Sequence, residues 1–310
     1  MKVLITGGAG FIGSHVVDQV VAAGHDPRIF DLIPSSYHHP DEFDTYIGDL
    51  TDPDAVADAA RGCDAIVHLA AVADVSQVAA DPGYAQRVNA GGTANVLEAA
   101  RSENVGRVVY ASTIWVYDGC DCALVDEETA LELPRHPYTA QKLAGEMYCT
   151  SYAELFGVDY TILRFGIPYG PRARPAAVIP SFFKNAIAGR PLTIAGGGLQ
   201  SRRFTYVGDM ALGVATALAP QARNRVYNLA SEETVTILQL ATAVSEIVGD
   251  TDILHTEGRA GDFRGAEVSS ARALRELGWR ASTCLEEGLA SYFGWLTDAD
   301  EAPADPDPVG

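Results

Sequence analysis

Short apolar runs alternate with longer stretches of helical pattern through the first half of the chain. The apolar runs are rich in β-branched residues and predict strands at Val3–Thr6, Arg28–Asp31, Ala65–His68, Arg107–Ser112 and Tyr160–Arg164. The stretches between them predict helices near 12–23, 54–61, 84–102 and 138–156. Because strands and helices alternate, we expect an α/β fold with a doubly wound parallel sheet and helices on both of its faces.

The regular alternation ends after Pro168. Glycine and proline interrupt the chain at 170–171, 190–191 and 196–198. Shorter helical runs follow near 177–188, 209–218, 236–248, 271–277 and 285–296. We therefore expect a first domain over 1–170 and a smaller mixed α/β lobe over 171–297. The acidic tail over 298–310 has no apolar period and is predicted to be disordered.

Composition and charge limit the partners of the protein. The 310 residues include 22 Lys and Arg against 41 Asp and Glu, a formal net charge of -19. Nucleic acids and anionic membranes both favour basic surfaces, so we expect neither as a partner. No apolar stretch is long enough to span a bilayer, and the N-terminus lacks a signal-peptide pattern. We expect a soluble, cytoplasmic protein.

The five cysteines show no paired spacing. They are Cys63, Cys120, Cys122, Cys149 and Cys284. The Cys120-Asp-Cys122 stretch could supply half of a metal site, but reduced thiols in a cytosolic protein are the simpler interpretation. We expect no metal.

A glycine cluster directly follows the first predicted strand and opens the first predicted helix. It reads Gly7-Gly-Ala-Gly10-Phe11-Ile12-Gly13. In this context glycines let the backbone approach a pyrophosphate, whose charge the helix N-terminus stabilises. The cluster therefore predicts dinucleotide binding, with a plain tight turn as the alternative.

Carboxylates at two strand ends are candidates for contacts with the nucleotide. Asp31 ends the second strand, where a carboxylate accepts hydrogen bonds from a ribose 2′-OH and repels a 2′-phosphate. This favours NAD over NADP, unless Asp31 only caps the strand. Asp49 and Leu50 could present a carboxylate and an apolar wall to the adenine, although Asp-Leu also fits a helix entry ahead of Asp52-Pro53.

Tyr138 and Lys142 stand four residues apart in a predicted helix. Positions i and i+4 share a helix face, so the ammonium can lower the phenol pKa from about 10 toward neutrality. A tyrosinate is then a usable general base toward a substrate hydroxyl. The spacing alone is common on solvated helix faces, and it gains meaning from the dinucleotide motif.

The chain resembles the extended short-chain dehydrogenase/reductase family, in particular the NAD-dependent nucleotide-sugar epimerases and dehydratases of the UDP-glucose 4-epimerase type. The resemblance runs from about residue 2 to 296 and rests on the glycine cluster, on Tyr138 and Lys142, and on motifs that occur in the same order. These motifs are Leu69-Ala70-Ala71, Asn89–Thr93, Ala111–Tyr117, Arg164–Arg172, Arg202–Asp209 and Gly261–Arg264. The resemblance implies a Rossmann domain that holds NAD, the catalytic residues within it, and a homodimer formed through the helices near 84–102 and 138–156.

Site residues follow from the resemblance. Leu69, Ala70, Ala71 and Asn89 fall at the cofactor, together with Tyr138 and Lys142. Thr113 falls where the family places its catalytic Ser or Thr, with Ser112 as the neighbouring candidate that strand alternation turns to the opposite face. Arg202 and Arg264 map onto the arginines that bind the substrate diphosphate, a task that suits a planar guanidinium.

The type of reaction is indicated by the two residues after Thr113. In the resembling epimerases NAD stays bound, the tyrosine takes the sugar 4-OH proton as C4 is oxidised, and the 4-keto sugar turns before it is reduced again. Relatives that eliminate water carry an acidic pair where this chain has Ile114 and Trp115. We therefore predict a nucleotide-sugar 4-epimerase.

Other activities remain open alternatives. They are a sugar dehydrogenase or reductase, a nucleotide-sugar dehydratase of the same family, and a non-catalytic NAD-binding regulator. The intact set of Thr113, Tyr138 and Lys142 argues against a regulator. Ile167 stands where the family usually has Asn, which affects the expected substrate more than the cofactor.

Overall fold

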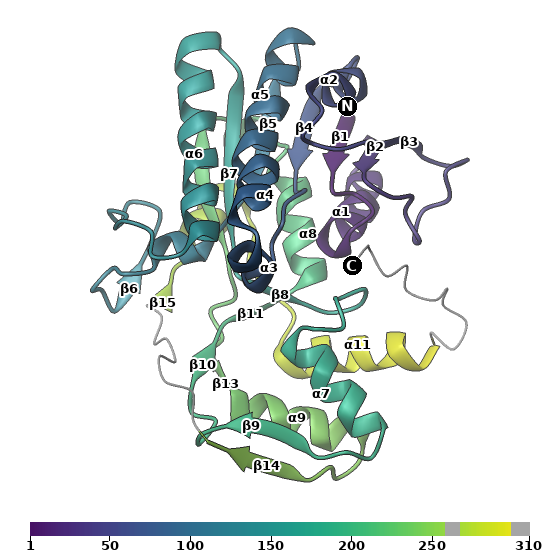
Figure 1. Cartoon of the computed structure of the whole chain (residues 1–310), viewed down its shortest axis with the longest axis vertical. Coiled ribbons are helices and arrows are strands. Elements are labelled where there is room, and N and C mark those ends of the chain that lie inside the picture. The colour runs from purple at the N-terminus through teal and green to yellow at the C-terminus, as the bar shows by residue number, and fades with distance from the viewer. Residues whose placement is uncertain (258–266, 299–310) are drawn as a thin grey trace. The chain divides into compact units, whose positions relative to one another are not determined.

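The computed structural model describes residues 1–257 and 267–298, and these form two compact units (Figure 1). The first unit comprises Met1–Pro168, Arg203–Glu232 and the described part of the segment that ends at Ser282. The second comprises Tyr169–Arg202, the residues 233–257, and the described residues from Thr283 onward. Of the predicted tail, the residues from 299 onward lie outside the described part of the chain. Within that part, no helix has the length and apolar character needed to cross a membrane.

A parallel sheet of seven strands forms the centre of the first unit, in the order β3-β2-β1-β4-β5-β7-β12. The strands are β1 Lys2–Thr6, β2 Asp26–Asp31, β3 Asp44–Ile47, β4 Ala65–His68, β5 Arg107–Thr113, β7 Asp159–Phe165 and β12 Arg225–Leu229. The predicted doubly wound parallel sheet is thereby confirmed. Strand order reverses between β1 and β4, and ligands of such sheets bind outside the carboxyl ends of the strands at this reversal.

Helices cover both faces of this sheet, as the alternation of apolar residues along β1 requires. Val3 and Ile5 pack toward α1 Phe11–Ala22 and α8 Val207–Thr216. Leu4 faces the other way and packs in one apolar cluster with residues of α2 Pro53–Ala60, α5 Gly92–Ser102 and α6 Pro137–Phe156. Each face of the sheet is therefore covered by apolar side chains of helices, and the sequence pattern predicted these helices correctly.

The helix predicted over 84–102 is not a regular α-helix. It consists of α4 Pro82–Gln86, a π-helical turn η1 Arg87–Gly91, and α5, with a short helix α3 Val75–Ala80 before it. A π turn carries one extra residue per turn and projects its side chains off the α-helical register. Here it lies at Asn89, whose side chain bonds to two other segments of the site described below.

The remaining elements of the first unit are short or come late in the chain. They are η2 Ile114–Tyr117, β6 Leu124–Val125, β11 Phe204–Tyr206, η3 Pro220–Ala222, β15 Glu267–Val268 and α10 Ala271–Leu277. Strand β8 Ile167–Tyr169 lies where the chain leaves this unit. Strand β12 and helices α8 and α10 thus belong to the first unit, although they follow residue 171.

The second unit is a small mixed lobe. Strand β9 Leu192–Ala195 pairs in parallel with β14 Ile253–Thr256, and β10 Ser201–Arg202 pairs antiparallel with β13 Val235–Thr236. Its helices are α7 Val178–Ile187, α9 Ile237–Val248 and α11 Leu285–Asp298. Phe183 of α7 packs against Tyr292 of α11 at 5.3 Å between ring centroids. The helices predicted near 177–188, 236–248 and 285–296 are confirmed.

Candidate cofactor and catalytic site

The glycine cluster forms a tight turn between β1 and α1. Gly7 has φ +74°, a left-handed conformation that glycine adopts without strain, and a Cβ on it would lie 2.8 Å from the Ala70 nitrogen. A Cβ on Gly13 would lie 1.9 Å from the Gly7 oxygen, so this helix turn packs directly on the strand end. Only glycine fits at these two positions.

Helix α1 begins after Gly10, which is extended and provides no side-chain cap. The N–H groups of the first turn, at Phe11, Ile12 and Gly13, therefore face the strand end without the side-chain oxygen that usually caps a helix. Such a set of donors, reinforced by the helix dipole, fits a pyrophosphate. The residues present thus suit a dinucleotide at the predicted place.

Asp31 lies beside this turn at the end of β2. Its Oδ2 accepts a hydrogen bond from the Ala9 N–H at 3.0 Å, and its Oδ1 accepts one from the Leu32 N–H at 2.7 Å. Burial raises the pKa of the Asp31 carboxyl, and the bonds to Leu32 and Ala9 act in the opposite direction. The contact with Leu32 is the strand-end cap foreseen as the alternative, while the contact with Ala9 brings the carboxylate to the glycine turn.

Asp49 and Leu50 lie after β3 with different surroundings. The Asp49 Oδ1 accepts a hydrogen bond from the Thr51 N–H at 2.8 Å. Leu50 is buried in the core between the sheet and the α2–α5 layer. Asp52 caps α2 by accepting from the N–H groups of Asp54 and Ala55, so the helix entry foreseen as the alternative is present.

The segment after β4 is fixed to β1. The Leu69 N–H donates to the Thr6 carbonyl at 3.1 Å, and the Ala70 N–H donates to the Thr6 hydroxyl at 3.3 Å. Leu69, Ala70 and Ala71 therefore come directly after β4, and Ala70 lies against Gly7 of the glycine turn.

Beneath this segment lies the buried His68, for which the sequence predicts only the end of a strand. The His68 Nδ1 lies 2.8 Å from the Thr6 hydroxyl, and its Nε2 lies 3.0 Å from the Thr93 hydroxyl. Thr93 donates to the Asn89 carbonyl at 2.6 Å, so it accepts from His68 Nε2–H. Burial, and secondarily the Lys142 charge, lower the pKa of His68 to about 3, so the imidazole is neutral.

Asn89 of the π turn joins two segments of the site. Its amide accepts from the Val72 N–H at 2.8 Å and donates to the Val72 carbonyl at 3.0 Å. It also donates to the Gln141 Oε1 at 2.7 Å. Gln141 precedes Lys142, where the family usually has Ser, so in this chain the loop after β4 is linked to α6 through an amide pair.

Helix α6 carries Tyr138 in its first turn and Lys142 one turn later. His136 caps the helix by accepting the Tyr138 N–H at 3.1 Å. The Lys142 ammonium is buried and donates to the Ala111 carbonyl of β5 at 2.9 Å. Burial lowers the pKa of Lys142 to about 8, so at neutral pH it remains mostly charged. Tyr138 is partly exposed, and the positive end of the helix dipole lies at its turn.

Thr113 is the last residue of β5 and begins η2. Its hydroxyl oxygen accepts the Trp115 N–H at 3.2 Å, which leaves the hydroxyl hydrogen to donate elsewhere. Ser112 faces α6 instead, and its hydroxyl donates to the Glu146 Oε1 at 2.5 Å. The two neighbouring hydroxyls therefore have different partners.

The two residues after Thr113 differ in burial. Ile114 packs against a small core that includes Val116 and Tyr117. Trp115 is 43% exposed, so its indole does not belong to the core. No acidic side chain occupies either position.

Of the two predicted diphosphate-binding arginines, the structure describes Arg202. Arg202 belongs to β10 of the second unit and donates to the Ser201 carbonyl at 2.9 Å. Arg264 lies outside the described residues. Within the described part of the chain, no group of three or more His, Cys, Asp or Glu side chains is arranged to hold a metal ion.

Comparison with known proteins gives the family. The sequence profile of the NAD dependent epimerase/dehydratase family matches residues 3–230. The chain belongs to this family. NAD is therefore its cofactor, in agreement with the donors of the glycine turn.

Members of the family with different activities are similar to the chain over nearly its full length. A UDP-glucose 4-epimerase of Mycolicibacterium smegmatis is 33% identical over 303 residues, covering 94% of this chain and 96% of the relative. The structure of a UDP-glucose 4-epimerase with UDP-glucose from Thermotoga maritima has a TM-score of 0.89 at 28% identity, covering 96% and 99% of the two chains. A dTDP-glucose 4,6-dehydratase from Streptomyces venezuelae, with NAD bound, has a TM-score of 0.87 at 29% identity, covering 97% and 98%. These similarities confirm the two-lobe fold and the family of nucleotide-sugar epimerases and dehydratases.

Proposed function

We propose that the protein is a nucleotide-sugar 4-epimerase that oxidises C4 of the sugar and reduces it again on the other face. The observation that carries this proposal is the pair Ile114 and Trp115 beside Thr113. Elimination of water needs a group that donates a proton and a group that abstracts one. Neither an isoleucine nor a tryptophan side chain can do either, so proton transfer at C4 is the chemistry left.

The first unit supplies the groups that would hold NAD. The turn from Gly7 to Gly13 would bind the pyrophosphate at the N-terminus of α1, and Asp31 would accept the ribose hydroxyls. Bound NAD supplies an acceptor and donor of hydride for sugar C4. The carboxylate of Asp31 favours NAD over NADP, because it would repel a 2′-phosphate.

Tyr138 takes the proton of the sugar 4-OH and returns it after the sugar has turned. The Lys142 ammonium favours the tyrosinate, as does the start of helix α6. The Thr113 hydroxyl, whose oxygen accepts the Trp115 N–H, would donate its own hydrogen to the sugar 4-oxygen. One group thus moves the proton and the other holds the oxygen.

Arg202 and Arg264 would hold the diphosphate of the substrate. A guanidinium bonds two phosphate oxygens at once, which would leave the sugar free to turn while the nucleotide stays bound. The acidic composition and the absence of a disulfide among the five cysteines, all of which the structure describes, support a cytoplasmic protein. We further propose a homodimer through α5 and α6, because α6 exposes Met147, Leu155 and Phe156.

A 4,6-dehydratase is the second candidate, since the Streptomyces venezuelae structure resembles this chain almost as closely as the epimerase does. Ile114 and Trp115 oppose it. The two activities give different products: an epimerase forms a C4 isomer of equal mass, whereas a dehydratase forms a product lighter by one water.

The test uses purified protein without added cofactor and a panel of nucleotide sugars. We expect C4 isomers to form, measured by chromatography and mass. Tyr138→Phe should abolish turnover and retain NAD, whereas Tyr148→Phe, which removes an exposed phenol on the same helix, should remain active. Loss of water from the product would establish the dehydratase, and accumulation of NADH a dehydrogenase. Epimerisation by Tyr138→Phe at the normal rate would rule out Tyr138 as the base.

A further inference from the structure

A third polar side chain follows Tyr138 and Lys142 on the same face of α6. Glu146 forms a buried ion pair with Arg164 of β7, in which Nε lies 3.0 Å from Oε1 and Nη2 lies 2.7 Å from Oε2. Glu146 is 6% exposed and Arg164 5% exposed. A folded protein is often as stable with apolar residues of similar volume as with a buried ion pair at the same position. Stability alone therefore does not explain why two charges lie here.

The pair contacts the chain on both sides of Thr113. Before it, the Ser112 hydroxyl donates to the Glu146 carboxylate at 2.5 Å. After it, the Arg164 Nη1 donates to the Tyr117 hydroxyl at 2.7 Å. Tyr117 is the last residue of η2, the turn that Thr113 begins. The ion pair thus holds both ends of the segment 112–117.

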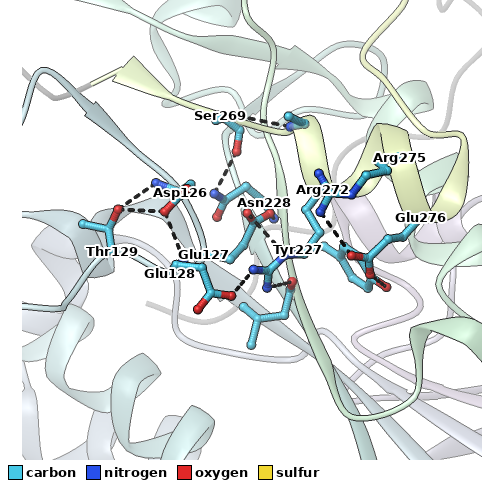
Figure 2. Close-up of polar contacts among 12 residues, drawn as sticks. Asp126, Glu127, Glu128, Thr129, Tyr227, Asn228, Ser269, Arg272, Arg275 and Glu276 are labelled. Carbon is cyan, nitrogen blue, oxygen red and sulfur yellow. Dashed lines mark hydrogen bonds and ion pairs between the residues drawn. The ribbon is translucent and has the colours of Figure 1, made fainter.

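Tyr117 extends the network to the edge strand β12. A guanidinium can only donate, so the Tyr117 hydroxyl accepts from Arg164 and donates to the Asn228 Oδ1 at 2.9 Å. Burial raises the pKa of Tyr117 to about 12, so the phenol keeps its proton. The Asn228 amide in turn donates to the Ser269 carbonyl at 2.9 Å, and its backbone N–H donates to Glu127 at 2.8 Å (Figure 2).

We infer that Glu146 and Arg164, acting through Ser112 and Tyr117, are positioning residues that hold segment 112–117 against helix α6. The inference rests on the proposed function, in which Thr113 and Tyr138 act on the same oxygen. In a 4-epimerase the sugar turns between two proton transfers, so the protein groups must keep their mutual positions while the substrate moves. The network keeps Thr113 and Tyr138 in fixed mutual positions, because one ion pair joins the helix of Tyr138 to both ends of the segment that carries Thr113.

The conservative variant Tyr117→Phe tests the inference, because it removes one hydroxyl and leaves the ion pair in place. Misplacement of a reacting group by about 1 Å costs up to about 100-fold in rate, so we expect kcat to fall about tenfold or more. KM for the nucleotide sugar and the NAD content should change less than twofold. Hydrogen exchange should become faster in peptides spanning 113–120, whose amides include those of Trp115 and Asp118. Ser112→Ala should likewise lower kcat and make exchange in 113–120 faster.

Thr161→Val is the matched control. It removes a fully buried hydroxyl from the same strand as Arg164, one that donates to the Ala222 carbonyl at 2.8 Å. It should lower stability while kcat and exchange in 113–120 stay unchanged.

The inference would be overturned by unchanged exchange in 113–120 for Tyr117→Phe, or by faster exchange with a kcat within twofold of the wild type. A rise in KM alone would also contradict it, because a positioning role predicts a change in kcat. If the wild type forms no C4 isomer, the proposed function fails, and the exchange measurement still decides whether the network holds the segment.

Discussion

Replacing Lys142 by Met should make the protein more stable and inactive. The Lys142 ammonium is buried, and a buried charge is disfavoured relative to a neutral side chain of the same shape. Methionine is unbranched and of similar length, so it can fill the same space. The variant therefore separates the cost of the charge from the packing of the side chain.

The magnitude follows from the pKa. Burial lowers the pKa of Lys142 from 10.5 to about 8. Each pKa unit corresponds to about 1.4 kcal/mol, so carrying the charge at pH 7 costs the folded state about 3 kcal/mol. Loss of the hydrogen bond to the Ala111 carbonyl offsets about 1 kcal/mol of this. At pH 7, Lys142→Met should be more stable than the wild type by about 2 kcal/mol.

The pH dependence provides a second check on the same charge. The folded pKa is lower than the unfolded one, so between about pH 8 and 10.5 the unfolded wild type binds more protons than the folded protein. The contribution of Lys142 to wild-type stability therefore rises with pH over this range. The advantage of the variant should be close to zero by about pH 10.

Urea unfolding followed by tryptophan fluorescence measures both quantities at pH 7 and pH 10. Lys184→Met is the matched control, because Lys184 is exposed on α7, and its effect should be small at both pH values. The reasoning is refuted if Lys142→Met is less stable than the wild type at pH 7. It is also refuted if the difference between the two proteins is the same at both pH values.

Three further predictions follow from the site. The turnover rate should fall as pH rises through about 8, because the Lys142 ammonium loses its proton there; a rate that stays level from pH 8 to 10 would contradict this role. Asp31→Ala should weaken discrimination against NADP by about tenfold, measured by reconstitution with either dinucleotide, as expected for one lost charge-assisted contact; unchanged discrimination would leave Asp31 as a strand cap only. Gly13→Ala should lose bound NAD and about 3 kcal/mol of stability, because its Cβ would lie 1.9 Å from the Gly7 oxygen. Gly294→Ala, at a helix position with open space around it, is the control and should be neutral or slightly stabilising in thermal unfolding.

The sequence by itself determined five of the seven strands of the parallel sheet, most helices and the glycine turn. These features depend on patterns that are short along the chain: strands of four to seven residues, the period of a helix, and glycines at a strand end. It also indicated that Tyr138 and Lys142 share a helix face, since that requires only four-residue spacing. The sequence did not predict the π turn at Asn89, because the contacts of Asn89 with Val72 and Gln141 join segments far apart in the chain.

Tertiary structure decided what lies beneath each side chain of the site. A helical repeat could have singled out Glu146, four residues after Lys142, but its partner Arg164 comes from another strand. Strand alternation separated Ser112 from Thr113, yet only the packing of α6 against β5 and β7 gave Ser112 a carboxylate to bind. The lowered pKa of Lys142 also results from tertiary packing, which buries the ammonium. Burial depends on which elements cover a residue, and that is set by contacts between distant parts of the chain rather than by local pattern.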